Sequence, residues 1–457
     1  MARVHFYAGM FVAPFIVIAA LSGALYAVSP TLERTVYQDQ ITATQSPTTL
    51  PLEQQIESAQ SRFPDLDVVQ VWPADEPGIA TRVLFADDSL NDGLDRAVFV
   101  DPATGTVQGD LSSYTGLGEL PVRSWISSLH KDLHLGPAGE LYSELAASWL
   151  LVLALSGVLL WWRKVRSTRT GKTSTATYLL RGIPARRGSR QKTMSLHATI
   201  GTWFTIVILG LAMTGLTWST FAGANIDSVV ERMNWRSDPL QTALIADGDA
   251  AAASDHADHQ GHTGAAPNFQ LPVDQAPDVL AVARQAGLEG PVRMFPPTDA
   301  DTAWRVSELW VPWTYSSDSI AINGHDGRIV DTQNFDELSL YSKLSSWGIY
   351  LHMGILFGLP LQIALAATAL SIAFLAVLGY RMWWKRRPTR GGVPTALGRL
   401  TGHQWYVYLI AAIVAGAIGA FLPLLGASLA VFVAIDLLLT LRTTIADRKS
   451  SPRAAHS

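Results

Sequence analysis

The sequence predicts an integral membrane α-helical bundle of about six transmembrane helices in a tandem repeat, with two extracytoplasmic α+β domains. Three observations predict this class. Of the 457 residues, 48% are hydrophobic, and they gather in runs of about 20, the length that spans a hydrocarbon core. The segments between the runs alternate between strongly basic and strongly acidic. Histidine-bearing segments recur in both halves of the chain.

The first recurring segment stands where an apolar run begins in each half. Residues 127–136 and 345–354 share Ser-Ser, Leu-His and a glycine two places later, which aligns His134 with His352 and replaces His130 by Gly348. The chain is therefore interpreted as a repeat built around histidines at membrane entrances.

A second pair of segments supports the repeat. Both read His-x-x-x-Gly and begin at His5 and His197, and Gly23 and Gly215 each lie eighteen residues past their histidine. Eighteen residues are five helical turns, so each glycine is expected on the face of its histidine, ~27 Å along the axis. Such a glycine makes room for a flat cofactor or serves ordinary packing of small residues between helices.

Charge asymmetry assigns the sides of the membrane. Residues 163–192 carry ten Lys or Arg and no acid, and by the positive-inside rule they are cytoplasmic. Residues 30–125 carry 15 acids against 5 Arg, and residues 222–342 carry 18 acids against 6 Arg, which indicates outer domains. A signal peptide is the alternative for the first run, but no cleavage site is evident. The last run, 405–441, is broken at Pro423 and is interpreted as two spans.

The expected organisation is a multi-pass protein of the inner cell membrane with both termini cytoplasmic. In chain order it comprises a first span (1–29), an outer domain (30–125), a second span (126–163), a basic cytoplasmic loop (164–195), a third span (196–220), a second outer domain (221–342), a fourth span (343–385), a cytoplasmic loop (386–402), a hairpin of two spans (403–441) and a cytoplasmic tail (442–457).

The two outer domains are also copies of each other. Leu-Pro-Leu-Glu-Gln at 50–54 recurs as Leu-Pro-Val-Asp-Gln at 271–275, and each domain ends in a strand, turn, strand pattern with Gly105 or Gly327 at the turn. These units resemble PepSY domains, and residues 1 to about 390 resemble the PepSY-associated transmembrane family. That family includes di-haem membrane reductases of ferric siderophores. The resemblance implies electron transfer to ferric iron held in a siderophore.

The paired histidines suggest how such electrons would be carried. His5 and His197 open spans entered from the cytoplasm, whereas His134 and His352 open spans entered from outside. Two imidazoles from two helices are the ligand set of a six-coordinate b-type haem, and two haem b groups are expected. The absence of cysteine excludes covalent haem attachment, iron–sulfur clusters and disulfides. An isolated zinc site would need a third or fourth ligand; an interfacial structural role is the alternative.

Other histidines are secondary candidates. His130 precedes His134 by four residues and is expected on the same helix face, as a second ligand candidate or a contact to the cofactor's propionates. His403 opens the fifth span as an alternative inner ligand or an interfacial residue. A stretch rich in Ala, Gly and Asp carries three more, which could gather a divalent ion or simply be solvated: His256, His259 and His262.

The function predicted from these features is a transmembrane electron conduit. The donor is expected to be a separate cytoplasmic reductase or a membrane quinol, because no dinucleotide-binding motif follows a strand. The acceptor is ferric iron in a siderophore, with copper(II) as a variant. Lipid and haem are the other partners; no nucleic acid and no catalytic side chain are predicted. The alternatives are a cofactor-free regulatory, sensing or protease-inhibiting module, and a transporter, which the uncharged span centres disfavour.

Overall fold

The computed structural model describes residues 2–114, 116–168, 174–186, 188–244, 269, 271–385 and 405–450. The chain forms two compact units. The helical unit comprises Met1–Ala24, His130–Arg232 and Ala367–Ser457, and the sheet unit comprises Leu25–Leu129 and Met233–Ala366.

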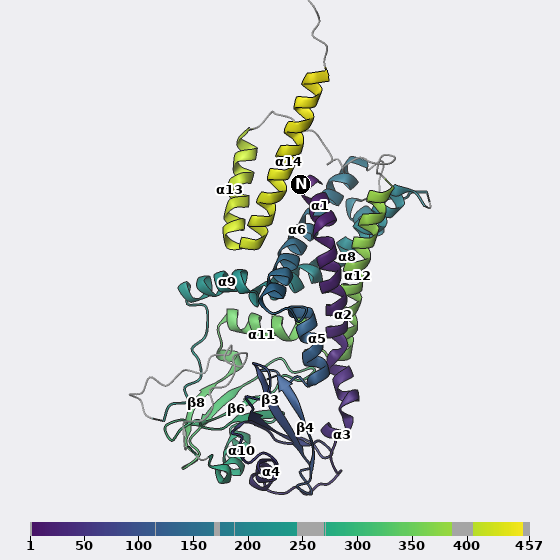
Figure 1. Ribbon diagram of the computed structural model, residues 1–457. Helices are drawn as coiled ribbons and strands as arrows, with labels where there is room; N and C mark the ends of the chain where they lie inside the picture. The colour runs from purple at the N-terminus through teal and green to yellow at the C-terminus, as the bar shows by residue number, and fades with distance from the viewer. Residues whose placement is uncertain are drawn as a thin grey trace, which may run out of the picture. The chain divides into compact units, whose positions relative to one another are not determined.

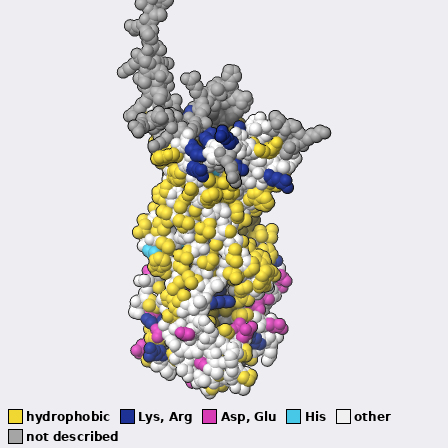
Figure 2. Space-filling view, turned by 90° about the vertical axis from the view of Figure 1, so that its right-hand side faces the viewer, with side chains coloured by type: hydrophobic (Ala, Val, Ile, Leu, Met, Phe, Trp, Pro, Cys, Tyr) yellow, Lys and Arg dark blue, Asp and Glu magenta, His cyan; other side chains and the backbone are white. Residues whose placement is uncertain are grey.

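Four helices are long and apolar enough to cross a membrane, within the described part of the chain: α2 (Ala13–Val36), α6 (Pro137–Thr168), α8 (Arg190–Thr217) and α12 (Leu359–Trp384). Figure 2 shows hydrophobic side chains covering the visible helical face, with Lys and Arg gathered at one end of it. This distribution agrees with the positive-inside assignment of the basic loop. Shorter helices are α1 (Ala2–Phe11), α7 (Thr175–Arg181) and α9 (Thr220–Arg232).

The last apolar stretch forms two helices that meet at the expected break. Helix α13 (Trp405–Phe421) ends just before Pro423, where α14 (Pro423–Ser450) begins. Their close approach is made by glycines, since a Cβ on Gly419 would lie 2.8 Å from the Cα of Gly426. That both helices cross the membrane, giving six spans, stays a prediction.

The first apolar run is interrupted near Pro14 rather than continuous. Proline has no N–H for the carbonyl four residues earlier, so α1 ends at Phe11 and α2 starts at Ala13. The carbonyl of Met10 instead accepts a hydrogen bond from the Tyr380 hydroxyl of α12 at 2.8 Å. The expectation of five unbroken turns between His5 and Gly23 was therefore wrong, whereas α8 does run unbroken past Gly215.

The two α+β copies, β1 to β4 and β5 to β8, share one antiparallel sheet of eight strands in the order β4-β3-β2-β1-β5-β6-β7-β8. The sequence predicted two α+β domains but not this union, which is made by antiparallel pairing of Val71 with Met294. Because the order reverses at this pair, the two four-stranded copies are related by an approximate twofold axis. The strands are β1 (Val68–Trp72), β2 (Thr81–Ala86), β3 (Leu94–Val100), β4 (Val107–Tyr114), β5 (Val292–Phe295), β6 (Trp304–Glu308), β7 (Ser319–Ile322) and β8 (Ile329–Gln333).

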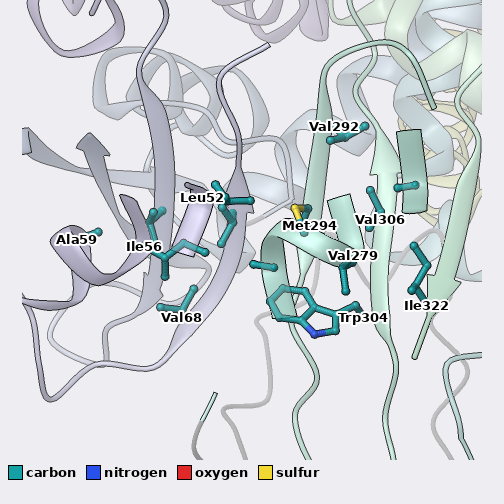
Figure 3. Packing of buried hydrophobic residues seen from close by; sticks show 14 of the residues in the cluster. Leu52, Ile56, Ala59, Val68, Val279, Val292, Met294, Trp304, Val306 and Ile322 are labelled. Atoms are coloured by element: carbon teal, nitrogen blue, oxygen red, sulfur yellow. The ribbon is translucent and has the colours of Figure 1, made fainter. Parts of the chain in front are cut away.

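One face of this sheet carries the core of the unit. Helices α4 (Leu52–Gln60) and α10 (Ala276–Gln285) pack their apolar sides on it, and Ile56, Met294 and Trp304 are fully buried between them (Figure 3). Successive strand side chains point to opposite faces. On the other face, Leu84, Ala97 and Phe99 of β2 and β3 belong to a second apolar cluster, whereas β5 and β6 place arginine and serine side chains there. The remaining elements are α3 (Gln38–Ile41), α5 (Pro121–Lys131), α11 (Leu340–His352) and the 3-10 turns Val273–Gln275 and Phe335–Glu337.

The predicted hairpin turns are confirmed in both copies. Gly105 connects β3 to β4 with φ +73°, and Gly327 connects β7 to β8 with φ +69°. An L-residue rarely adopts this left-handed conformation, which explains glycine at both places.

Candidate cofactor site

His5 and His197 line the same cavity of the helical unit. The cavity measures about 350 Å³ and lies among α1, α6, α8 and α12. Both rings are partly buried, and they are close enough to interact electrostatically. The structure therefore brings together the inner pair that the repeat selected.

The His5 ring is oriented by a serine of α6. Its Nδ1 lies 2.8 Å from the Ser156 hydroxyl, and that hydroxyl donates its own hydrogen to the Val152 carbonyl. Ser156 therefore accepts from His5, which places the imidazole hydrogen on Nδ1 and leaves the lone pair on Nε2.

The His197 ring reaches the same tautomer by a different contact. Its Nδ1 lies 3.0 Å from the carbonyl oxygen of Leu375 in α12. A carbonyl can only accept, so Nδ1 must donate and Nε2 carries the lone pair. A histidine held at one ring nitrogen by such a partner is the usual arrangement of a metal ligand.

The cavity wall combines small residues with two cations. Cβ atoms added to Gly9 or Gly379 would meet no atom within 4 Å, so these glycines border open space. A Cβ on Gly157 would lie 3.2 Å from the Cε1 of His5, so a larger residue there would crowd the ring. Two cations, Lys164 and Arg190, also line the wall and are suited to the propionates. These residues fit a b-type haem.

The donor set does not resemble a structural zinc site. Across the described ranges, no group of three or more His, Cys, Asp or Glu side chains is placed to hold a metal ion. Two imidazoles with open space between helices match axial ligation of a haem instead.

His130 and His134 do not share a helix face, so that expectation was wrong. Helix α5 ends at Lys131, and His134 follows in a turn with φ +56°. The His130 ring lies against α2, where its Nδ1 is 3.1 Å from the Ser22 hydroxyl and its Cε1 is 2.9 Å from the position of a Cβ on Gly23. Gly23 thus makes room for an imidazole in this structure.

The remaining candidates are not tested by the structure. His134 belongs to the helical unit and His352, the last residue of α11, belongs to the sheet unit. Their pairing at an outer haem stays a prediction. His403 and the three histidines of the Asp-rich stretch lie outside the described residues: His256, His259 and His262.

Sequence reasoning missed the groups that orient the inner histidines. Ser156 stands out in the sequence only as a polar residue within an apolar run, which indicates a partner but does not identify it. The Leu375 carbonyl leaves no sequence signal, because every residue has one.

Comparison with models of protein families gives a match. The family model described as the PepSY-associated TM region matches residues 2–386 of the 457. Comparison with curated proteins gives no match.

Proposed function

The chain belongs to the family of PepSY-associated transmembrane regions, and from this premise we propose that it is a transmembrane di-haem b oxidoreductase. The observation that carries the proposal is the pair His5 and His197, which line one cavity with both Nδ1 atoms engaged and both Nε2 atoms available as ligands. The inner haem would be held there.

Each part of the inner site has a task in this proposal. Ser156 and the Leu375 carbonyl hold the imidazole planes, and Gly157 leaves the His5 ring its space. The apolar wall excludes water. When bound, a haem supplies a centre that accepts and releases one electron, which no side chain of this cysteine-free chain does at ordinary potentials.

The rest of the proposed path follows the membrane topology. The donor would be a separate cytoplasmic reductase or a membrane quinol. His134 and His352 would hold a second haem, which would supply a one-electron centre on the outer side of the inner membrane. The acceptor would be ferric iron held in a siderophore. The substrate class comes from the resemblance to ferric-siderophore reductases, and copper(II) is the variant acceptor.

Haem stoichiometry tests the proposal. We expect pyridine haemochrome analysis of the purified protein to give about two haem b per chain, and about one after His5→Ala or His197→Ala. His325→Ala, an exposed histidine of the β7–β8 hairpin, is the matched control and should keep both. A value near zero in the wild-type protein would overturn the proposal in favour of a cofactor-free binding module.

The same variants test the direction of transfer. In His197→Ala, the outer haem should be reduced by dithionite but not by the physiological donor, and ferric-siderophore reduction should stop. Normal reduction of the outer haem by that donor would show that electrons do not enter through the inner site. Loss of a haem in His130→Ala but not in His134→Ala would assign the outer ligand to His130.

A further inference from the structure

The sheet unit contains a second cavity, of about 120 Å³, on the face of the sheet that α4 and α10 leave uncovered. Its floor consists of outward-facing residues of β5 to β8, and its wall includes residues of α11. Strand alternation explains the polar floor: Met294 and Val306 point into the core, so Arg293 and Arg305 point the other way.

Three guanidinium groups line this cavity. Arg293 comes from β5, Arg305 from the neighbouring β6, and Arg236 from the segment after α9. The acidic residue of the lining is Asp238, so the wall carries a net positive charge. Hydroxyl groups of Ser307 and other serines add neutral donors, which together with planar guanidinium groups form the donor set that oxyanions prefer.

Comparison with the equivalent strands of the first copy, β1 to β4, shows which of these arginines is found only in the second copy, β5 to β8. Trp72 pairs with Arg82 across β1 and β2, as Phe295 pairs with Arg305 across β5 and β6. In both copies the arginine stacks on that aromatic ring, at 4.8 Å and 3.6 Å. Val71 and Met294 face each other across the approximate twofold axis and are therefore equivalent positions. The residue before Met294 is Arg293 and the residue before Val71 is Gln70, so Gln70 is the counterpart of Arg293.

The first copy also neutralises its own cations. Glu119 and Glu33, 1% and 8% exposed, lie beside Arg82 and Arg123, and Glu119 Oε1 is 3.3 Å from Arg123 Nε. Buried cations normally require such partners.

Among the described residues, the second copy places its carboxylates differently. Aligning Ser127-Ser128 with Ser345-Ser346 puts Glu337 in the place of Glu119 and Tyr341 in the place of Arg123. Glu337 is exposed and does not line the cavity. Compared with the first copy, the second copy has kept one arginine (Arg305), gained another (Arg293) and has an exposed glutamate in place of a buried one, and arginines outnumber acids in the described lining of the cavity.

An aromatic pair borders the cavity. Trp310 and Tyr350 stack with ring centroids 4.5 Å apart and planes inclined by 17°, and both line the cavity. Stacked rings lose little freedom when a ligand binds, so this part of the wall is preorganised.

We propose that this cavity binds a compact oxyanion of the carboxylate or phosphate class. The inference deepens the proposed function by naming the chemistry of the group through which the acceptor docks, and only that role rests on the proposed function. Oxyanion binding itself requires no haem and no electron. A negative result for oxyanion binding can therefore be distinguished from a negative result for the di-haem function.

Isothermal titration calorimetry of the full-length protein in detergent tests the site, with citrate and inorganic phosphate as separate probes. We expect saturable binding of at least one probe, weakened about tenfold or more by Arg293→Gln, which introduces the residue of the first copy. Arg328→Gln removes an exposed charge from the β7–β8 hairpin and should leave binding unchanged. Citrate alone would assign a carboxylate site, and phosphate alone a phosphate site.

Two outcomes would overturn the inference: neither probe binds the wild-type protein, or Arg293→Gln binds as tightly as wild type. Thermal unfolding checks that the variant is folded. If Arg293→Gln does not fold, Arg236→Gln carries the same expectation, because Arg236 lies outside the sheet ladder.

Discussion

The two inner histidines obtain the same tautomer from chemically different partners. Aligning Trp161 with Trp383 places Leu153 where Leu375 stands in the second half, and Ser156 lies three residues, about one turn, beyond Leu153. A side-chain hydroxyl thus does for His5 what a main-chain carbonyl does for His197. Only the hydroxyl can be removed by substitution, which makes Ser156 the residue through which ligand orientation is testable.

Ser156→Ala should weaken the inner haem without removing a ligand. His5 would lose the acceptor that holds its Nδ1, and loss of such a partner typically weakens metal binding by about 10–100-fold. Haem titration into haem-depleted protein measures the effect. Ser148→Ala is the matched control, since Ser148 is also buried in α6 but bonds to the Leu145 carbonyl of its own helix. Equal affinity in Ser156→Ala and wild type would contradict the assignment.

At the level of secondary-structure elements, the turn of the β3–β4 hairpin is stabilised by the carboxylate of Asp101. Asp101 Oδ1 accepts hydrogen bonds from the amides of Ala103 and Thr104, and Oδ2 accepts from the amide and hydroxyl of Thr44. Burial alone would raise the pKa of this carboxyl, but these hydrogen bonds outweigh it and hold the pKa below its usual value. The second copy has Asn323 at the equivalent position, whose oxygen accepts from the His325 amide.

Asp101→Asn should loosen this hairpin at neutral pH. The amide loses one acceptor oxygen and the charge, at a cost of about 1–3 kcal/mol in local opening free energy. Because the folded pKa is lowered, the carboxylate stabilises the hairpin above its unfolded pKa of ~3.9, and this contribution is lost as the pH falls through the folded pKa. The advantage of wild type over the variant should therefore shrink below about pH 4.

Hydrogen–deuterium exchange of β3–β4 peptides in the full-length protein measures that opening. Asp92 is an exposed carboxylate next to β3, and Asp92→Asn should show the same hairpin exchange as wild type both at neutral pH and below about pH 4. Unchanged hairpin exchange in Asp101→Asn at pH 7 would refute the prediction.

For the whole molecule, charge determines the expected orientation. The basic segment follows α6, and the acidic segments supply the strands of the sheet unit. A membrane protein with this asymmetry places the basic side in the cytoplasm. The direction of electron flow in the proposal depends on this orientation.

Substituted cysteines test the orientation without background, because the chain has no native cysteine. Ser89 and Ser174 are both exposed, in the sheet unit and in the basic segment. We expect Ser89→Cys to react with an impermeant thiol reagent in intact cells, and Ser174→Cys to react only after permeabilisation. The reverse pattern would invert the orientation and, with it, the proposed path.

Features that depend on local composition and period were predictable from the amino-acid sequence. Apolar length predicted the four membrane helices, the recurring His-x-x-x-Gly segments selected His5 and His197, and the glycine positions located both hairpin turns. Local patterns suffice here because span length, helix period and positive φ are properties of short segments.

How these segments meet was not predictable from local sequence and is seen in the folded chain. The tertiary structure joined two predicted domains through the pairing of Val71 with Met294, ended α5 before His134, and supplied Ser156 and the Leu375 carbonyl to the inner histidines. Each of these depends on groups far apart in the chain. An open strand edge will pair with any compatible strand, and a carbonyl is present at every residue, so neither partner is specified by local sequence.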